Sequence, residues 1–253
     1  MIFTIDKYRG HEYKHFLTGN EKMRNFSSQI RDLIKLVNND KYLKLPNGQE
    51  IKLHFDWQHM NSSQIMCINF FLSYWNHPKD LKSIFDNILL NSGKKIIGLP
   101  TKIKFEDQES ANDGTNVDLV IDLDNGSKIF IEVKYTERGF GKISSKVKKR
   151  NPNYYFNKRI TIHKDIIVDQ SNYEKYYQFI RNIYLGRNGN YTLFLYPFEN
   201  NFIENEYNKC SNKEIIENIN DFEFGRLYWE DLLKILPNED FRLKYFGIED
   251  DWK

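Results

Sequence analysis

Two acidic residues and a lysine, Asp118, Glu132 and Lys134, lie in the stretch NVDLVIDLDNGSKIFIEVKYTE and together could support hydrolysis of a phosphodiester. Apolar side chains alternate along the segments 117–123 and 128–135, which predicts two half-buried strands. Two carboxylates held side by side repel each other unless a cation lies between them. Hard oxygen ligands suit Mg²⁺, which completes its shell with water and phosphate oxygens.

The turn between the two strands decides whether these side chains meet. A two-residue turn would pair Leu119 with Glu132 and mix apolar and charged faces. A three-residue loop with Gly126 in the left-handed conformation instead pairs Asp118 with Glu132 and places both apolar rows on one face. We therefore predict this second register. It forms two further cross-strand pairs, Val120 with Phe130 and Asp122 with Lys128.

In this arrangement Asp118 and Glu132 would hold Mg²⁺, and the backbone carbonyl of Val133 would add a third oxygen. Mn²⁺ should be able to substitute for Mg²⁺. Lys134 would orient the attacking water and offset the charge that develops on the phosphate. The alternative is a surface hairpin with solvated charges, because Glu-x-Lys occurs by chance in many strands.

At these residues the chain resembles the PD-(D/E)xK nuclease superfamily. Asp118 matches the first acid of its motif and residues 132–134 match the (D/E)xK element, although Val117 stands where the motif has proline. Longer stretches look like a family of bacterial restriction endonucleases within that superfamily: SSQIMCINFF at 62–71, GTNVD…IEVKYTE at 114–137, and YQFIRNIYL at 177–185 with the following LFLYPFENN.

The resemblance implies a metal-dependent DNA endonuclease of type II restriction type with a restriction-endonuclease-like α/β core. That core is a central mixed β-sheet flanked by α-helices. The resemblance also implies double-stranded DNA as substrate and a homodimer that cuts both strands. A separate methyltransferase is a candidate partner.

Length and composition agree with a folded enzyme. The chain has 253 residues, 40% of them hydrophobic and 15% aromatic, which excludes a disordered chain and allows a large core. Two cysteines suit a reducing compartment, and no run approaches the roughly 20 apolar residues of a membrane span. We expect a cytoplasmic protein with one nuclease domain over 1–253. It would comprise a largely helical part at 1–95, a catalytic core at 96–200 and a helical part at 201–253.

The pattern of apolar residues and of turn residues predicts the elements around the hairpin. Helices are expected at 21–38, from Ser62 or Ser63 to Trp75, from Pro78 to about Leu90, at 173–185, and near 212–219 and 229–236. Strands are expected at 51–55, 96–106 and 191–196, with a turn at Pro46–Gly48.

The segment from Arg138 to Lys164 contains no acidic residue, carries interleaved aromatic residues and follows the second strand directly. Such a stripe suits a phosphate backbone, although a solvated loop is the alternative. The residues predicted to bind DNA here are Lys142, Lys146, Lys148, Lys149, Arg150, Lys158 and Arg159.

Further candidates lie nearby. Gln178, Arg181 and Asn182 share one helix face and are part of the resemblance. Gln178 is assigned to catalysis and the other two to DNA, against the alternative of an exposed polar face. Glu137 is a candidate catalytic residue if the strand ends before it. The scattered histidines His54, His59 and His77 receive no role.

Two other functions remain open. One is a repair or recombination nuclease that recognises DNA structure, and the other is a DNA-binding module that keeps the fold without catalysis. A binding module has no need of adjacent carboxylates beside a lysine, so the triad argues against it.

Overall fold

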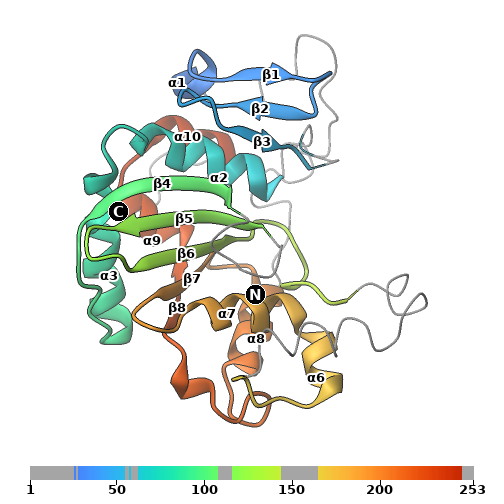
Figure 1. Cartoon of the computed structure of the whole chain (residues 1–253). Helices are drawn as coiled ribbons and strands as arrows, with labels where there is room; N and C mark the ends of the chain where they lie inside the picture. Colours follow the sequence, from blue (N-terminus) through green and yellow to red (C-terminus); the bar gives the residue numbers. More distant parts are fainter. Residues whose placement is uncertain are drawn as a thin grey trace.

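A five-stranded sheet of order β4-β5-β6-β7-β8 forms the centre of the protein, as seen in a computed structural model (Figure 1). The structure describes residues 26, 28–54, 57, 62–107, 116–143 and 165–246. The strands β4 to β6 pair antiparallel, whereas β6, β7 and β8 run parallel. This confirms the predicted mixed sheet with the hairpin near its centre. The strands are β4 (Pro100–Asp107), β5 (Val117–Leu123), β6 (Lys128–Val133), β7 (Tyr191–Tyr196) and β8 (Phe224–Tyr228).

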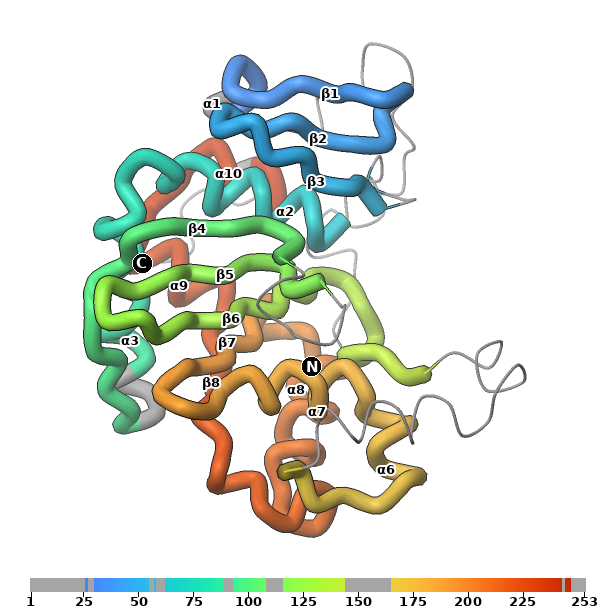
Figure 2. The backbone as a smooth tube through the Cα atoms, viewed as in Figure 1, coloured from blue at the N-terminus to red at the C-terminus, as the bar shows by residue number. Residues whose placement is uncertain are grey.

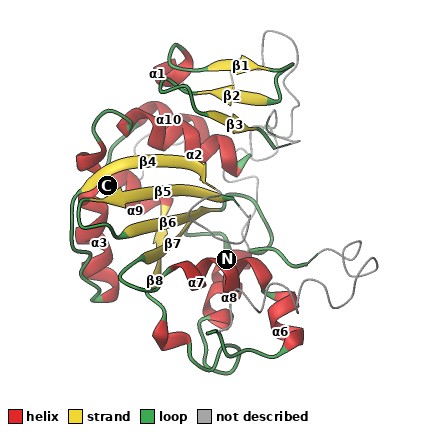
Figure 3. Cartoon of the chain, viewed as in Figure 1, coloured by secondary structure: helices red, strands yellow, loops and turns green. Residues whose placement is uncertain are grey.

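Helices cover both faces of this sheet (Figures 1 and 3). One face packs on α2 (Ser63–Phe71), α3 (Lys82–Ser92), α9 (Trp229–Ile235) and α10 (Glu239–Tyr245). The other face packs on α6 (Gln170–Lys175), α7 (Tyr177–Leu185) and α8 (Asn201–Cys210). Short 3-10 helices complete the chain: η4 (Leu72–Tyr74), η5 (Pro78–Leu81) and η6 (Ile219–Asp221).

The alternation of apolar and polar side chains along β5 and β6 explains how the sheet is fixed between these layers of helices. Leu119, Ile121, Ile129 and Ile131 are fully buried and belong to the larger core under α2 and α3. Each such side chain contributes roughly 1.5–3 kcal/mol when it leaves water. A shift of the pairing by one residue would expose the whole row, so the burial stabilises one register.

A second, three-stranded antiparallel sheet lies beyond the outer edge of β4 (Figure 2). It contains β1 (Lys35–Val37), β2 (Tyr42–Lys44) and β3 (Glu50–Lys52), preceded by the short helix α1 (Ser28–Arg31). The β2–β3 turn lies at the predicted Pro46–Gly48. Gln49 in that turn donates a hydrogen bond to the carbonyl of Phe105 on β4 at 3.1 Å.

The predicted helix at 21–38 is therefore wrong after Arg31. The apolar spacing did identify core residues, since Phe26, Ile30 and Ile34 are buried. The backbone at Asn38 to Asp40 has φ between 53° and 61°, a left-handed turn that a helix cannot contain. The chain reverses there and pairs as strands, so the N-terminal part contains a sheet as well as helices.

The C-terminal part also differs from expectation. Residues 212–218 form turns instead of a helix, whereas α8 and the strand β8 were not predicted. The predicted helix at 173–185 is two helices, with a break at Tyr176. By contrast, β7 lies at the predicted 191–196, and Ser62 caps α2 by accepting from the N–H of Ile65.

None of the helices in the described ranges is long and apolar enough to cross a lipid bilayer.

Candidate active site

The β5–β6 hairpin has the predicted register. Val120 pairs with Phe130 and Asp122 with Lys128, and Gly126 has φ 85° in the connecting loop. The carboxylate of Asp122 also forms an ion pair with the ammonium of Lys128. Because the pairing is antiparallel, Asp118 and Glu132 follow on the same face. Their side chains line one cavity, as the three-residue loop predicts.

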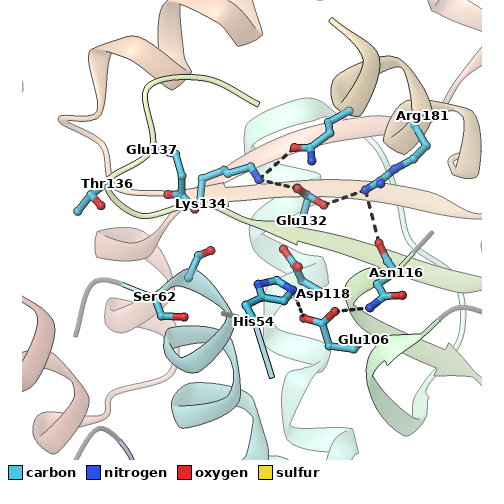
Figure 4. A pocket seen from close by; sticks show the side chains of 12 residues that line it. His54, Ser62, Glu106, Asn116, Asp118, Glu132, Lys134, Thr136, Glu137 and Arg181 are labelled. Carbon is cyan, nitrogen blue, oxygen red and sulfur yellow. Dashed lines mark hydrogen bonds and ion pairs between the residues drawn. The ribbon is translucent and has the colours of Figure 1, made fainter. Parts of the chain in front are cut away.

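This cavity has a volume of about 520 Å³ and lies at the end of the sheet where β5 begins and β6 ends (Figure 4). Each of its lining residues has a polar or charged side chain, which suits a phosphate and a cation better than an apolar ligand. The lining residues come from α2, β4, β5, β6 and α7 and from the segments after β3, before α2, before β5 and after β6: His54, Ser62, Ser63, Glu106, Asn116, Asp118, Glu132, Lys134, Thr136, Glu137, Gln178 and Arg181.

Glu132 lies between two cations. Its Oε1 is 2.7 Å from the Nζ of Lys134, and its Oε2 is 3.6 Å from Nη2 of Arg181. All three side chains are nearly buried. Burial alone would raise the pKa of Glu132, but the charges of Lys134 and Arg181 lower it below the ordinary value. Glu132 is therefore held as a carboxylate.

Asp118 has the opposite electrostatic environment. Its Oδ2 accepts a hydrogen bond from the backbone N–H of Val133 at 2.8 Å. Burial, followed by the charges of Glu132 and Glu106, raises its pKa well above the ordinary value of an aspartate. A negative charge here is unfavourable until a cation joins it, and this donor set fits a hard divalent ion.

A complete metal cage is not preformed. Among the described residues, no group of three or more His, Cys, Asp and Glu side chains is arranged to hold a metal ion. Asp118 and Glu132 would supply two oxygens, and water and phosphate would supply others, as is usual for Mg²⁺. Val133 contributes to the site through its backbone N–H, which donates to Asp118. That the carbonyl of Val133 binds the metal stays a prediction.

Two further predicted residues reach the cavity. Oε1 of Gln178 lies 3.4 Å from the Nζ of Lys134, which donates to it. Glu137 follows the end of β6, and its Oε2 accepts from the backbone N–H of Tyr135 at 2.5 Å. Because the strand has ended, Glu137 faces the cavity and not away from it.

Arg181 and Asn182, predicted to bind DNA, lie at the back of the site. Arg181 is 8% exposed and Asn182 only 1%. The guanidinium of Arg181 donates to Oδ1 of Asn182 at 3.1 and 3.2 Å. This burial argues against direct contact of Asn182 with DNA, and it indicates that the pair supports Glu132 from behind.

The basic segment after β6 is only partly described. Lys142 is exposed, which agrees with contact to a large ligand but does not test it. The other six residues predicted to bind DNA there, Lys146, Lys148, Lys149, Arg150, Lys158 and Arg159, lie outside the described residues.

Glu106, Asn116 and His54 were not predicted to belong to the site. Glu106 is on β4 and Asn116 just precedes β5, and both line the cavity with His54. Gln64, at the start of α2, holds Glu106 from behind. A signal for Glu106 exists in the sequence, since alternation along 100–107 places it on the face opposite Ile103 and Phe105. No sequence signal brings His54 here, because its approach depends on how β3 packs.

Comparison with known proteins adds one finding. The sequence model of the family described as "Restriction Endonuclease associating with ARP" matches residues 6–246. The match spans both sheets, the hairpin and the helices around the cavity. No curated protein and no solved structure matches the chain significantly.

Proposed function

The chain belongs to the family of restriction endonucleases associating with ARP, and from its nuclease-type function we propose a Mg²⁺-dependent endonuclease that hydrolyses phosphodiester bonds of double-stranded DNA. The proposal takes the site to be of the PD-(D/E)xK type. One observation carries it: Asp118, Glu132 and Lys134 meet in a single polar cavity, with the lysine 2.7 Å from the second acid.

The residues divide the work of this reaction between them. Asp118 and Glu132 would hold the ion, which when bound polarises the phosphate and lowers the pKa of a water molecule. Arg181 limits the negative charge on Glu132, and the fixed N–H of Val133 keeps Asp118 oriented. Fixed groups of this kind need no reorganisation when charge develops on the phosphate.

Lys134 acts as a cation and not as a base. Burial opposes its charge, but the carboxylates of Glu132, Glu137 and Asp118 raise its pKa above the ordinary value of a lysine. An ammonium that keeps its proton cannot take one from water. It can orient the water and stabilise the negative charge of the transition state.

Partners follow from the same proposal. Cutting both strands of a duplex favours a homodimer, and a restriction role favours a separate methyltransferase that protects the host DNA. The description of the family names an association with ARP, so we propose ARP as a further protein partner.

Cleavage of supercoiled plasmid by the purified protein tests the function. We expect cleavage with Mg²⁺ or Mn²⁺ and none with EDTA. Lys134→Met should slow cleavage by about 10²–10³-fold. Lys79→Met, at an exposed lysine of η5, is the matched control and should cleave as the wild type does.

The products separate the possible functions. Discrete fragments support a restriction role, and preference for branched substrates would support a repair nuclease instead. DNA binding without cleavage at any metal concentration would indicate a binding module. Cleavage that Lys134→Met leaves at the wild-type rate would overturn the assignment of the site.

A further inference from the structure

The wall of the cavity opposite Lys134 holds a second ionisable pair, Glu106 and His54, which the proposed hydrolysis has not yet used (Figure 4). In the view of Figure 4, Glu132 and Lys134 lie on one side of the cavity and His54 and Glu106 on the other. An in-line displacement at phosphorus can use groups on two opposite sides of a cavity, because the attacking water and the leaving oxygen are on opposite sides of the phosphate.

Glu106 is held rigidly by two amide side chains. Its Oε1 accepts from Nε2 of Gln64 at 2.9 Å, and its Oε2 accepts from Nδ2 of Asn116 at 2.8 Å. The side chain is only 5% exposed. Its backbone has φ 49°, a left-handed conformation that is strained for a residue with a side chain. Such strain is tolerated where the surroundings fix a group for use.

Gln64 connects this carboxylate to the histidine. Its Nε2 also donates to the carbonyl of Lys52 at 3.0 Å, and its Oε1 accepts from the backbone N–H of His54 at 2.9 Å. The amide thus uses both ends, and it is itself 2% exposed. The position of His54 relative to Glu106 is therefore set by a buried bridge and not by the surface.

The imidazole of His54 bridges the buried carboxylate and the open cavity. Its Nε2 lies 3.7 Å from Oε1 of Glu106, while about half of the side chain, 51%, is exposed. A carboxylate within about 4 Å of a ring nitrogen forms an ion pair with the ring whenever the ring carries a second proton. Nε2 faces Glu106, and the exposed half of the side chain lies on the wall of the cavity.

We propose that His54, held by Glu106, is the general acid that protonates the leaving deoxyribose oxygen. This role rests on the proposed phosphodiester hydrolysis. The water oxygen forms a bond to phosphorus while the bond from phosphorus to the leaving oxygen breaks. The leaving oxygen keeps the electron pair and takes a proton from the imidazolium. The proton lost by the water passes to solvent, and the neutral imidazole later regains one from solvent.

The chemistry of the two side chains also favours Lys134 as the fixed cation and His54 as the proton donor. Lys134 is engaged by Glu132 at 2.7 Å and by Gln178 at 3.4 Å on its own side of the cavity. An alkoxide is a poor leaving group, and general acids at such a position typically accelerate a reaction by about 10²–10⁴-fold. A histidine titrates near neutral pH and can therefore give up a proton that a lysine retains.

The test compares two leaving groups. Duplex DNA with sulfur in place of one bridging oxygen, at the 3′ or the 5′ position, releases a thiolate. A thiol has a pKa of about 8.5, so a thiolate leaves without an acid. We expect His54→Ala to slow cleavage of the all-oxygen duplex by about 10²-fold or more and to cleave the sulfur duplex nearly as fast as the wild type does. The position at which sulfur rescues identifies the bond that breaks.

Two matched variants complete the experiment. His77→Ala, at an exposed histidine before η5, should leave both rates unchanged. Glu106→Gln keeps the size of the side chain but removes its charge. It should show a smaller defect than His54→Ala, again confined to the oxygen duplex. DNA affinity measured with Ca²⁺ in place of Mg²⁺ should be equal for all proteins.

Each outcome decides something. If His54→Ala loses the same factor on both duplexes, the residue has a structural role and the proposal is wrong. If His54→Ala cleaves the oxygen duplex as fast as wild type, the proposal is also wrong. If the wild type cleaves neither duplex with Mg²⁺ or Mn²⁺, the failure belongs to the proposed function itself.

Discussion

The backbone N–H of Val133 donates a 2.8 Å hydrogen bond to the carboxylate of Asp118. The first acid of the site is thereby fixed to the end of β6, the strand that carries the other acid and is followed directly by Lys134. Val133 lies between Glu132 and Lys134, so one backbone group sets the position of Asp118 relative to both. This contact explains why the acid can stay in place although its own charge is unfavourable there.

The Asp118→Asn variant should separate stability from function. The amide oxygen can still accept from Val133, while the repulsion with Glu132 and Glu106 disappears. Without metal we expect a higher melting temperature, by about 2–4 °C for each kcal/mol relieved. Cleavage and the stabilisation by added Mn²⁺ should be lost. Calorimetry with EDTA and with Mn²⁺ measures both effects.

The size of this effect depends on pH. The folded protein raises the pKa of Asp118, so the carboxylate destabilises the fold above its unfolded pKa. The advantage of the Asn variant should be present at pH 7 and shrink as the pH falls to the ordinary aspartate value of 3.8. A variant that melts below the wild type in EDTA at pH 7 would contradict the account.

Arg181→Met should reduce cleavage without changing how DNA binding depends on salt. Arg181 is buried beside Glu132, so we expect it to act through this carboxylate and not by neutralising a DNA phosphate. The slope of the logarithm of DNA affinity against the logarithm of salt concentration should stay constant. Lys142→Met is the comparison. If the exposed Lys142 contacts a phosphate, its removal should reduce the magnitude of this slope by about 1. A reduced slope for Arg181→Met would mean that it reaches DNA after all.

Asp122 should stabilise the hairpin in a pH-dependent way. Its carboxylate is 2.8 Å from the Nζ of Lys104 and also pairs with Lys128. Burial works to raise its pKa, but these two lysines lower it below the ordinary value of 3.8. A carboxylate whose pKa is lower in the folded protein stabilises the fold at any pH above its pKa in the unfolded chain. This stabilisation is lost as the pH falls through its pKa in the folded protein.

Asp122→Asn should therefore cost about 0.5–1 kcal/mol near neutral pH, a value typical of partly exposed ion pairs. Urea denaturation measures the free energy of unfolding, and the gap to wild type should close below pH 3.8. Asp86→Asn, at an exposed position of α3, should show no such change. A gap that persists at acid pH would exclude the charge as its cause.

Gly225 on β8 leaves room for the ring of Tyr191 on the neighbouring strand. A Cβ added at Gly225 would lie 2.2 Å from the hydroxyl oxygen of Tyr191, which is buried. Gly225→Ala should cost about 1–3 kcal/mol through overpacking. Adding Tyr191→Phe removes the clashing oxygen and should recover part of the loss. Urea denaturation measures the free energy of unfolding of both single variants and of the double variant. If the losses of the two single variants simply add, the contact between Gly225 and Tyr191 does not limit stability.

Periodicity explains which parts of the molecule could be predicted. The register of β5 and β6 follows from two rows of apolar residues, because only one pairing buries both. That register alone brings Asp118 opposite Glu132. The strand β7 is equally clear, since six consecutive buried residues from Tyr191 to Tyr196 form a short apolar run. Local pattern and burial agree in these segments.

The remaining errors concern residues whose state depends on distant contacts. Gln64 and Glu106 are 42 positions apart in the chain, and no local sequence pattern predicts the hydrogen bond between them. The strand β8 contains Gly225 and Arg226, which weaken its pattern, and it becomes a strand because β7 offers a parallel partner. The DNA-binding role of the basic segment stays a prediction.

The hydrogen bond from Gln49 to Phe105 affects how two copies of the protein could assemble. An uncovered border strand invites another chain to add to the sheet. Here the β2–β3 turn covers that border of β4 at Phe105, two positions before the residue pair Asp107 and Val117 at the start of β5. Two subunits facing a duplex could not merge their sheets through β4 without displacing this turn. The two subunits would have to contact each other through a different surface. That contact would set the distance between the two active sites, and therefore the length of the overhang at the cut ends.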